Sequence, residues 1–115
     1  MARGRHFTFP AHVAVEFLVG VALAVAPLVF DFDDGATIVS LAFGVATATG
    51  AMSTGISGHG ISLHHAWDRL LVPLLLVTAV VSAITDIGIE TAVFTAAALI
   101  EGVMLAITRY VPERA

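Results

Sequence analysis

The chain has 115 residues, of which 58% are hydrophobic and 12% are charged, and its formal net charge is −4. Ordinary soluble domains carry roughly 25% charged residues, so this composition argues against a soluble domain and favours a single membrane domain. The acidic balance and the lack of a basic patch argue against nucleic-acid binding. The chain contains no cysteine, which excludes disulfides and thiolate metal sites.

Four apolar segments follow one another along the chain. About 20 helical residues cross the ~30 Å hydrocarbon core of a bilayer, so we expect membrane-spanning helices over residues 11–30, 36–52, 63–85 and 91–110. An acidic turn over 31–35, a Gly/Ser loop over 53–62 and a second acidic turn over 86–90 separate them. The second segment is rich in Ala, Thr and Gly, and we expect it to pack against neighbouring helices rather than to face lipid broadly.

The charges between the apolar segments alternate in sign. The arginines lie at one set of segment ends: Arg3, Arg5, Arg69, Arg109 and Arg114. The acidic residues of the two turns lie at the other: Asp31, Asp33, Asp34, Asp86 and Glu90. By the positive-inside rule, we expect a multi-pass cell-membrane protein with both termini and the loop 53–62 in the cytoplasm, and with both acidic turns outside.

The start of the chain also has features of a cleavable signal peptide. Arg3 and Arg5 precede the first apolar segment, and Ala-Val-Ala at 24–26 is similar to a cleavage site. Pro27 would directly follow the cut, however, and the apolar run continues to Phe30. We therefore expect the first segment to be retained as a helix.

The chain aligns with itself, without a gap, at an offset of 52 residues. His12 falls on His64, Glu16 falls on Asp68, and Gly50 falls on Gly102. Each half is one helical hairpin that begins and ends on the same side of the membrane. We therefore predict an all-α single domain over 1–115 made of two parallel repeats, about 11–54 and about 63–110, related by a pseudo-two-fold axis along the membrane normal.

A proline lies late in the first helix of the first hairpin, in Ala-Pro-Leu at 26–28. The second hairpin has Thr-Ala-Val at the corresponding positions, 78–80. With its two hairpins, this pattern resembles the SPW-repeat family of small prokaryotic membrane proteins, whose Ser-Pro-Trp motif occupies that place. Only Pro27 of the motif is kept. The resemblance implies a four-helix architecture for nearly the whole chain, and it implies no catalytic residues.

Glu101 is the most unusual residue of the sequence. A carboxylate this deep in an apolar segment costs on the order of 2.5–3.5 kcal/mol on insertion scales, so it must face protein or water. Glu16 lies at a similar depth on the same side, and Arg69 is the arginine nearest to a helix interior. We therefore expect Arg69 to pair with Glu16 or Glu101 in a buried ion cluster. This cluster would be a structural ion pair between the hairpins, a protonatable site on an ion path, or a site completed by another subunit.

Two His–carboxylate pairs form a second candidate site. His12 and Glu16 are four residues apart on one helix face, and His64 and Asp68 repeat that spacing. Histidine and carboxylate at a related spacing bind metals in di-metal helical bundles, so these four residues are candidate metal ligands. Alternatively, each histidine lies at the headgroup level and bonds the carboxylate of its own helix. We expect no bound cofactor.

No nucleophile–base arrangement is recognisable in the sequence, and we expect no enzymatic activity. Our leading functional hypothesis is an accessory or scaffold component of the lipid bilayer. It would contact other membrane subunits, or itself, through small residues such as Gly20 and Ala24. The alternatives are an oligomeric ion or proton conductor that uses Glu101, Glu16 and Arg69, and a membrane protein that binds metal through the His–carboxylate pairs.

Overall fold

The computed structural model of this chain describes residues 7–57, 61–85 and 87–108. It contains the α-helices α1 (Phe9–Val29), α2 (Asp34–Ser57), α3 (Ile61–Thr85) and α4 (Ile89–Ile107). All four are long and apolar enough to cross a membrane. The prediction of a multi-pass membrane protein with four helices is therefore confirmed, while the orientation of its termini stays a prediction.

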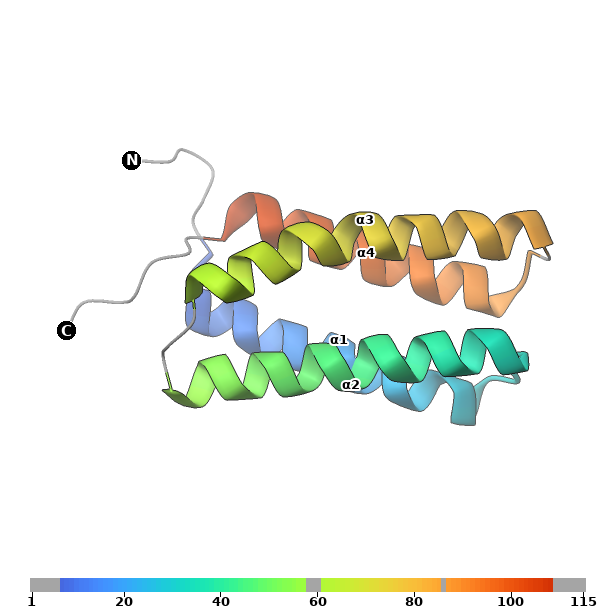
Figure 1. Cartoon of the computed structure of the whole chain (residues 1–115), viewed down its shortest axis with the longest axis horizontal. Coiled ribbons are helices and arrows are strands. Elements are labelled where there is room, and N and C mark those ends of the chain that lie inside the picture. The colour runs from blue at the N-terminus through green and yellow to red at the C-terminus, as the bar shows by residue number, and fades with distance from the viewer. Residues whose placement is uncertain (1–6, 58–60, 86, 109–115) are drawn as a thin grey trace.

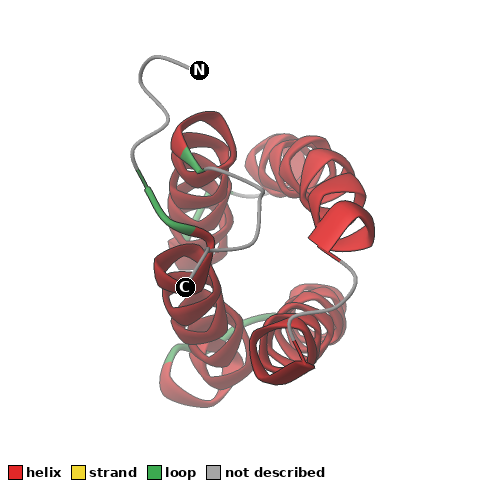
Figure 2. Cartoon of the chain, turned by 90° about the vertical axis from the view of Figure 1, so that its left-hand side faces the viewer, coloured by secondary structure: helices red, strands yellow, loops and turns green. Residues whose placement is uncertain are grey.

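The helices form two antiparallel hairpins, α1–α2 and α3–α4, that lie side by side (Figure 1). The helices surround a common axis, with α1 packed on α2 and α4, and α3 packed on α4 and α2 (Figure 2). Helices α1 and α3 are therefore diagonally opposite. We call the end where α1 and α3 begin the site end, and the end with the two intra-hairpin connections the turn end. The hairpins pack more closely within themselves than against each other.

Glycines allow α1 and α2 to approach closely, as the small-residue spacing predicts. A Cβ atom added at Gly20 would lie 2.6 Å from the backbone nitrogen of Ala48, and one added at Gly44 would lie 2.5 Å from the backbone nitrogen of Ala24. Only glycine leaves room for this contact. In lipid, where apolar burial gives no drive between helices, such close packing holds a hairpin together.

Helix α1 contains Pro27, and α2 compensates for the hydrogen bond that this proline removes. Because proline has no N–H, the carbonyl of Leu23, four residues earlier, lacks its usual intrahelical donor. The hydroxyl of Ser40 in α2 donates to this carbonyl at 2.5 Å, and Ser40 is fully buried. The bond satisfies a backbone group that lipid could not solvate.

Helix α2 is longer than predicted. It begins at Asp34 because the Asp33 side chain accepts a hydrogen bond from the Ala36 amide at 2.7 Å, as an N-capping residue does. It continues to Ser57, so the first half of the predicted loop 53–62 is helical. Within this last part, the Thr54 hydroxyl donates to the Gly50 carbonyl at 2.9 Å and so needs no solvent partner.

Helix α4 ends at Ile107, before the predicted end at residue 110, and residues 109 and 110 lie outside the described residues. Thr108 is extended, and its amide donates to the Met104 carbonyl. The Phe7 amide donates to the Ile107 carbonyl at 3.1 Å, so the segment before α1 pairs with the end of α4. The expected charges Arg3, Arg5, Asp86, Arg109 and Arg114 also lie outside the described residues.

Apolar side chains fill the middle of the bundle and cover its outer surface. The largest buried ones along the axis are Leu23, Leu71, Leu75 and Phe94. Large apolar side chains are also widely exposed, with Leu28 83% and Ile84 78% accessible. A water-soluble protein rarely exposes so much contiguous apolar surface, which is the surface expected to contact lipid.

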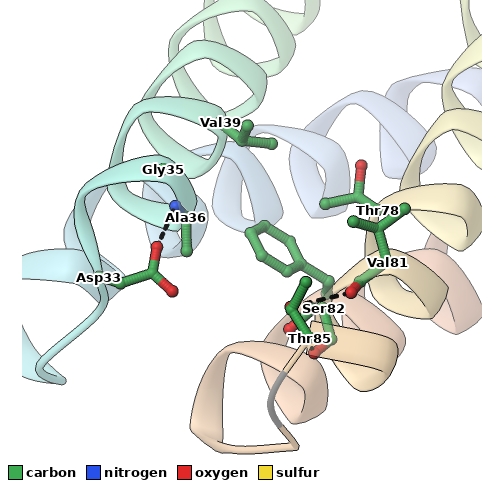
Figure 3. A pocket seen from close by; sticks show the side chains of 9 residues that line it. Asp33, Gly35, Ala36, Val39, Thr78, Val81, Ser82 and Thr85 are labelled. Carbon is green, nitrogen blue, oxygen red and sulfur yellow. Dashed lines mark hydrogen bonds between the residues drawn. The ribbon is translucent and has the colours of Figure 1, made fainter.

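A cavity of about 350 Å³ lies between the hairpins at the turn end (Figure 3). Its polar lining comes mainly from hydroxyl groups, each of which already has a partner. Thr78 and Thr85 donate to carbonyls of their own helix, and Ser82 bonds Thr91 at 2.8 Å. The cavity therefore offers few free donors or acceptors, and the unsatisfied polar groups of interest lie at the other end.

Candidate metal centre

The four candidate ligands come together at the site end. His12 and Glu16 come from α1, and His64 and Asp68 come from α3. One ligand atom from each residue lies within 4.8 Å of the other three, and all four side chains are buried. The i,i+4 spacing places each pair on one helix face, and both faces point to the bundle axis. We call these four residues the quartet.

Imidazoles and carboxylates alternate around the quartet. His12 Nε2 lies 3.2 Å from Glu16 Oε2 and 2.9 Å from Asp68 Oδ2. His64 Nε2 lies 2.5 Å from Glu16 Oε1 and 3.5 Å from Asp68 Oδ1. Each histidine therefore contacts the carboxylate of its own helix, as one hypothesis expected. The shorter contacts nevertheless cross between the hairpins.

A threonine orients the His64 imidazole. Thr54 Oγ1 lies 3.2 Å from His64 Nδ1, and the only hydroxyl proton of Thr54 is already donated to the Gly50 carbonyl. Nδ1–H must therefore donate to Thr54. In the neutral imidazole this leaves the lone pair on Nε2, the atom aimed at the two carboxylates. Metal-bound histidines show this same arrangement, in which the other ring nitrogen donates to a fixed acceptor.

A second threonine holds the His12 imidazole. His12 Nδ1 lies 2.8 Å from Thr108 Oγ1, directly after α4, where the Phe7–Ile107 backbone bond fixes the chain. In both cases the threonine belongs to the hairpin that does not contain the histidine. The threonine contacts therefore link the hairpins in both directions.

Phe9 packs against both histidines of the quartet. Its ring stacks on His12 with centroids 5.7 Å apart and meets His64 edge-on at 5.5 Å. Phe9 is itself buried beside Val13 and Ala51. Its apolar ring against both imidazoles lowers the local dielectric constant, which strengthens the electrostatic interactions inside the quartet.

Glu101, which comes from α4, lies beside the quartet and outside it. It is 1% exposed, and its carboxyl group contacts that of Glu16, with Asp68 nearby. Among the residues that the structure describes, neither Glu101 oxygen has a hydrogen-bond donor. The two carboxylates of the expected ion cluster therefore lie next to each other.

Arg69, in contrast, does not enter the cluster. Its side chain is exposed, and it forms no ion pair with Glu16 or Glu101 in the described ranges. The reason is helical geometry: Arg69 follows Asp68 directly, and successive side chains point about 100° apart around a helix. Because Asp68 faces the axis, Arg69 cannot. The expected pairing of Arg69 with a buried carboxylate is thus absent.

Sequence inspection missed Thr54 and Thr108 as partners of the histidines. The two threonines are 54 residues apart, whereas the repeat offset is 52, so an ungapped alignment does not match them. A threonine lies near the end of the second helix in each hairpin, and this shared position was the sequence feature that could have indicated the two contacts. Phe9 gave no signal beyond its place three residues before His12.

The spacing of the quartet is close to that of a metal site. Ligand atoms at 2.0–2.2 Å from a tetrahedral Zn²⁺ lie roughly 3.4 Å apart. The histidine–carboxylate contacts span 2.5 to 3.5 Å, and one donor atom from each residue lies within 4.8 Å of the other three, so side-chain adjustments would bring four donors to that spacing. Comparison with protein-family models, with curated proteins and with solved structures gives no match to this chain, and its function must be argued from this geometry.

Proposed function

We propose that this four-helix membrane protein binds a divalent transition-metal ion between its hairpins, with His12, Glu16, His64 and Asp68 as ligands. One observation carries the proposal: two imidazole Nε2 atoms and two carboxylates from diagonally opposite helices converge in a buried space. Imidazole and carboxylate are the donors that Zn²⁺, Fe²⁺ and Mn²⁺ take in proteins.

Charge balance supports a divalent ion at this centre. The carboxylates of Glu16 and Asp68 carry two negative charges, which are costly to bury without compensation. Two protonated imidazoles that alternate with the two carboxylates would balance the same charge, and metal content distinguishes this ion-paired state from the metal-bound one. A single divalent ion places the positive charge where all four donors converge.

The proposed ion would act as a link between the hairpins. The hairpins pack loosely against each other, and lipid supplies no hydrophobic drive for their association. An ion with two ligands from α1 and two from α3 would join them directly. Because metal binding is coupled to folding, the loaded protein should be more stable than the metal-free one.

Metal content measures this proposal directly. The detergent-purified protein is loaded with Zn²⁺, desalted and analysed by elemental mass spectrometry, and its thermal unfolding is compared with and without chelator. We expect at least one tightly held Zn²⁺ per chain and a lower unfolding temperature after chelation. The double variant His12→Ala/His64→Ala should lose both effects, because it removes both imidazole ligands.

The matched control is His65→Ala, which removes the adjacent histidine, outside the quartet. It should retain the metal and the response to chelator. Wild-type protein that binds no Zn²⁺, Fe²⁺ or Mn²⁺ and whose unfolding is unchanged by metal would refute the proposal. The quartet would then be an ion-paired core that joins the hairpins.

A second candidate role, as an accessory or scaffold component, is favoured by the outer face of α2. Ala42, Ala46, Thr49 and Ser53 are exposed and follow the helical spacing of one stripe. Small side chains in a row let another helix approach closely in lipid. This role is compatible with metal binding, because the stripe shares no residue with the quartet. Native mass spectrometry after mild extraction would distinguish a larger complex from an isolated chain.

Ion conduction has less support. Arg69 is exposed, and apolar Leu71, Leu75 and Phe94 fill the axis between Glu101 and the turn end. Membership of the SPW-repeat family stays a proposal that rests on Pro27 and the two hairpins.

A further inference from the structure

We propose that the centre holds two metal ions, the second of them bound by Glu101 and joined to the first through Glu16. This inference rests on the proposed function, since it requires the quartet to bind the first ion. It assigns to Glu101 the role of a metal ligand.

The environment of Glu101 is the first reason. Its carboxyl group is almost completely buried, it contacts another carboxyl group, and neither of its oxygens has a donor among the described residues. Buried polar atoms in folded proteins are nearly always satisfied by a partner. Glu101 faces the acceptor oxygens of Glu16, so it is satisfied either by a proton shared between the two carboxyl groups or by a cation between them, and its position and charge favour the cation.

The position of Glu101 is the second reason. It contacts Glu16 but lies outside the compact group formed by the quartet. A single ion at the centre of the quartet would therefore leave Glu101 to one side. An ion between Glu16 and Glu101 would use both, and each carboxylate oxygen has two lone pairs, so Glu16 can serve both ions.

The sum of charges is the third reason. Glu16, Asp68 and Glu101 carry three negative charges when ionised, and one divalent ion leaves one of these charges uncompensated in a buried place. Two divalent ions carry four positive charges, one more than the three carboxylates balance. A single bridging hydroxide neutralises this excess charge. The hydroxide forms from water, whose proton leaves to solvent. The complete donor set is then two imidazoles and three carboxylates from α1, α3 and α4. Di-iron and di-manganese centres in helical bundles are built from the same donor types on facing helices.

The test is metal stoichiometry with Glu101→Gln as the variant. Glutamine keeps the shape of the side chain but removes the charge. The purified proteins are loaded with Mn²⁺ or Zn²⁺, desalted and analysed for metal per chain, and the Mn²⁺ samples are examined by electron paramagnetic resonance. Two Mn²⁺ ions about 4 Å apart, the spacing typical of two-metal sites, couple magnetically, so their spectrum differs from that of an isolated ion. Circular dichroism checks that each variant is folded.

We expect two ions per chain and a coupled Mn²⁺ spectrum for the wild type, and one ion with an uncoupled spectrum for Glu101→Gln. The matched control is Glu90→Gln, a carboxylate of the same helix about 16 Å away at the turn end, which should keep two ions. A folded wild type with one ion, unchanged by Glu101→Gln, would refute the second site and leave the proposed function intact. Two ions in Glu101→Gln, or none, would refute the assignment to Glu101. A wild type without metal would refute both proposals.

Discussion

At the scale of single residues, the threonines that contact the histidines decide what the imidazoles can do. Thr54 accepts from His64 Nδ1 because its own proton is donated to the Gly50 carbonyl. The Gly50 carbonyl and the Thr54 hydroxyl together thus place the proton of the neutral His64 imidazole on Nδ1. A histidine at the same place without this acceptor could turn either nitrogen to the quartet.

We predict that Thr54→Val lowers the affinity for Zn²⁺ by about 10- to 100-fold, the usual effect of losing a hydrogen-bond partner of a metal-bound histidine. Thr54→Ser, which keeps the hydroxyl, should restore most of the affinity. Titration of the purified protein against a competing chelator gives the measurement. The control is Thr78→Val, which removes an exposed hydroxyl that bonds only its own helix. Equal affinities for Thr54→Val and the wild type would show that Thr54 does not orient the ligand.

At the scale of helices, hairpin α1–α2 is held by complementary backbone features. Gly20 and Gly44 allow the close approach, and Ser40 supplies the donor that Pro27 removes from the Leu23 carbonyl. A proline inside a transmembrane helix is tolerated where a neighbour satisfies the freed carbonyl in this way. The proline and the serine are therefore expected to depend on each other energetically.

A double-mutant cycle tests this dependence. Ser40→Ala should destabilise the protein by about 1–3 kcal/mol, because it leaves a buried carbonyl without a donor. In a Pro27→Ala background the alanine N–H can bond the Leu23 carbonyl, so the same substitution should cost clearly less. Unfolding in mixed detergent micelles measures both values. Additive effects of the two substitutions would contradict the coupling.

At the scale of the whole molecule, the quartet lies at one end of the bundle and the acidic turns lie at the other. The starts of α1 and α3 and the ends of α2 and α4 share the site end (Figure 1). If the arginine-rich ends face the cytoplasm, as the positive-inside rule predicts, the quartet lies in the cytoplasmic half of the membrane. The proposed ion would then enter from the cytoplasm.

Cysteine labelling tests this orientation in a chain that has no cysteine of its own. A membrane-impermeant thiol reagent applied to intact cells should label the Asp34→Cys variant and leave the Ser57→Cys variant unlabelled. Labelling after cell lysis shows that both variants are reactive. Labelling of intact cells at position 57 and not at position 34 would reverse the predicted topology.

The sequence by itself determined the number of spans and the identity of the quartet. Apolar length is enough to predict a membrane helix because the bilayer imposes a fixed thickness on each segment. The i,i+4 spacing of His12 with Glu16, and of His64 with Asp68, fixes which side chains share a helix face, since this depends on local geometry alone. The 52-residue offset aligned the His12–Glu16 pair with the His64–Asp68 pair, so both were considered as one candidate site. The duplication itself stays a prediction, which the alternating arrangement of the quartet supports.

The tertiary structure decided which partners these side chains meet. Whether Arg69 or the histidines would face Glu16 depended on the rotation of α3 about its axis, and burial of Asp68 turns Arg69 outward. The contacts of His12 with Thr108, and of Ser40 with the Leu23 carbonyl, join residues that no sequence spacing relates. The rotation of each helix and its contacts are set by packing over the whole bundle. The partners of the quartet residues could therefore be identified only from the folded structure.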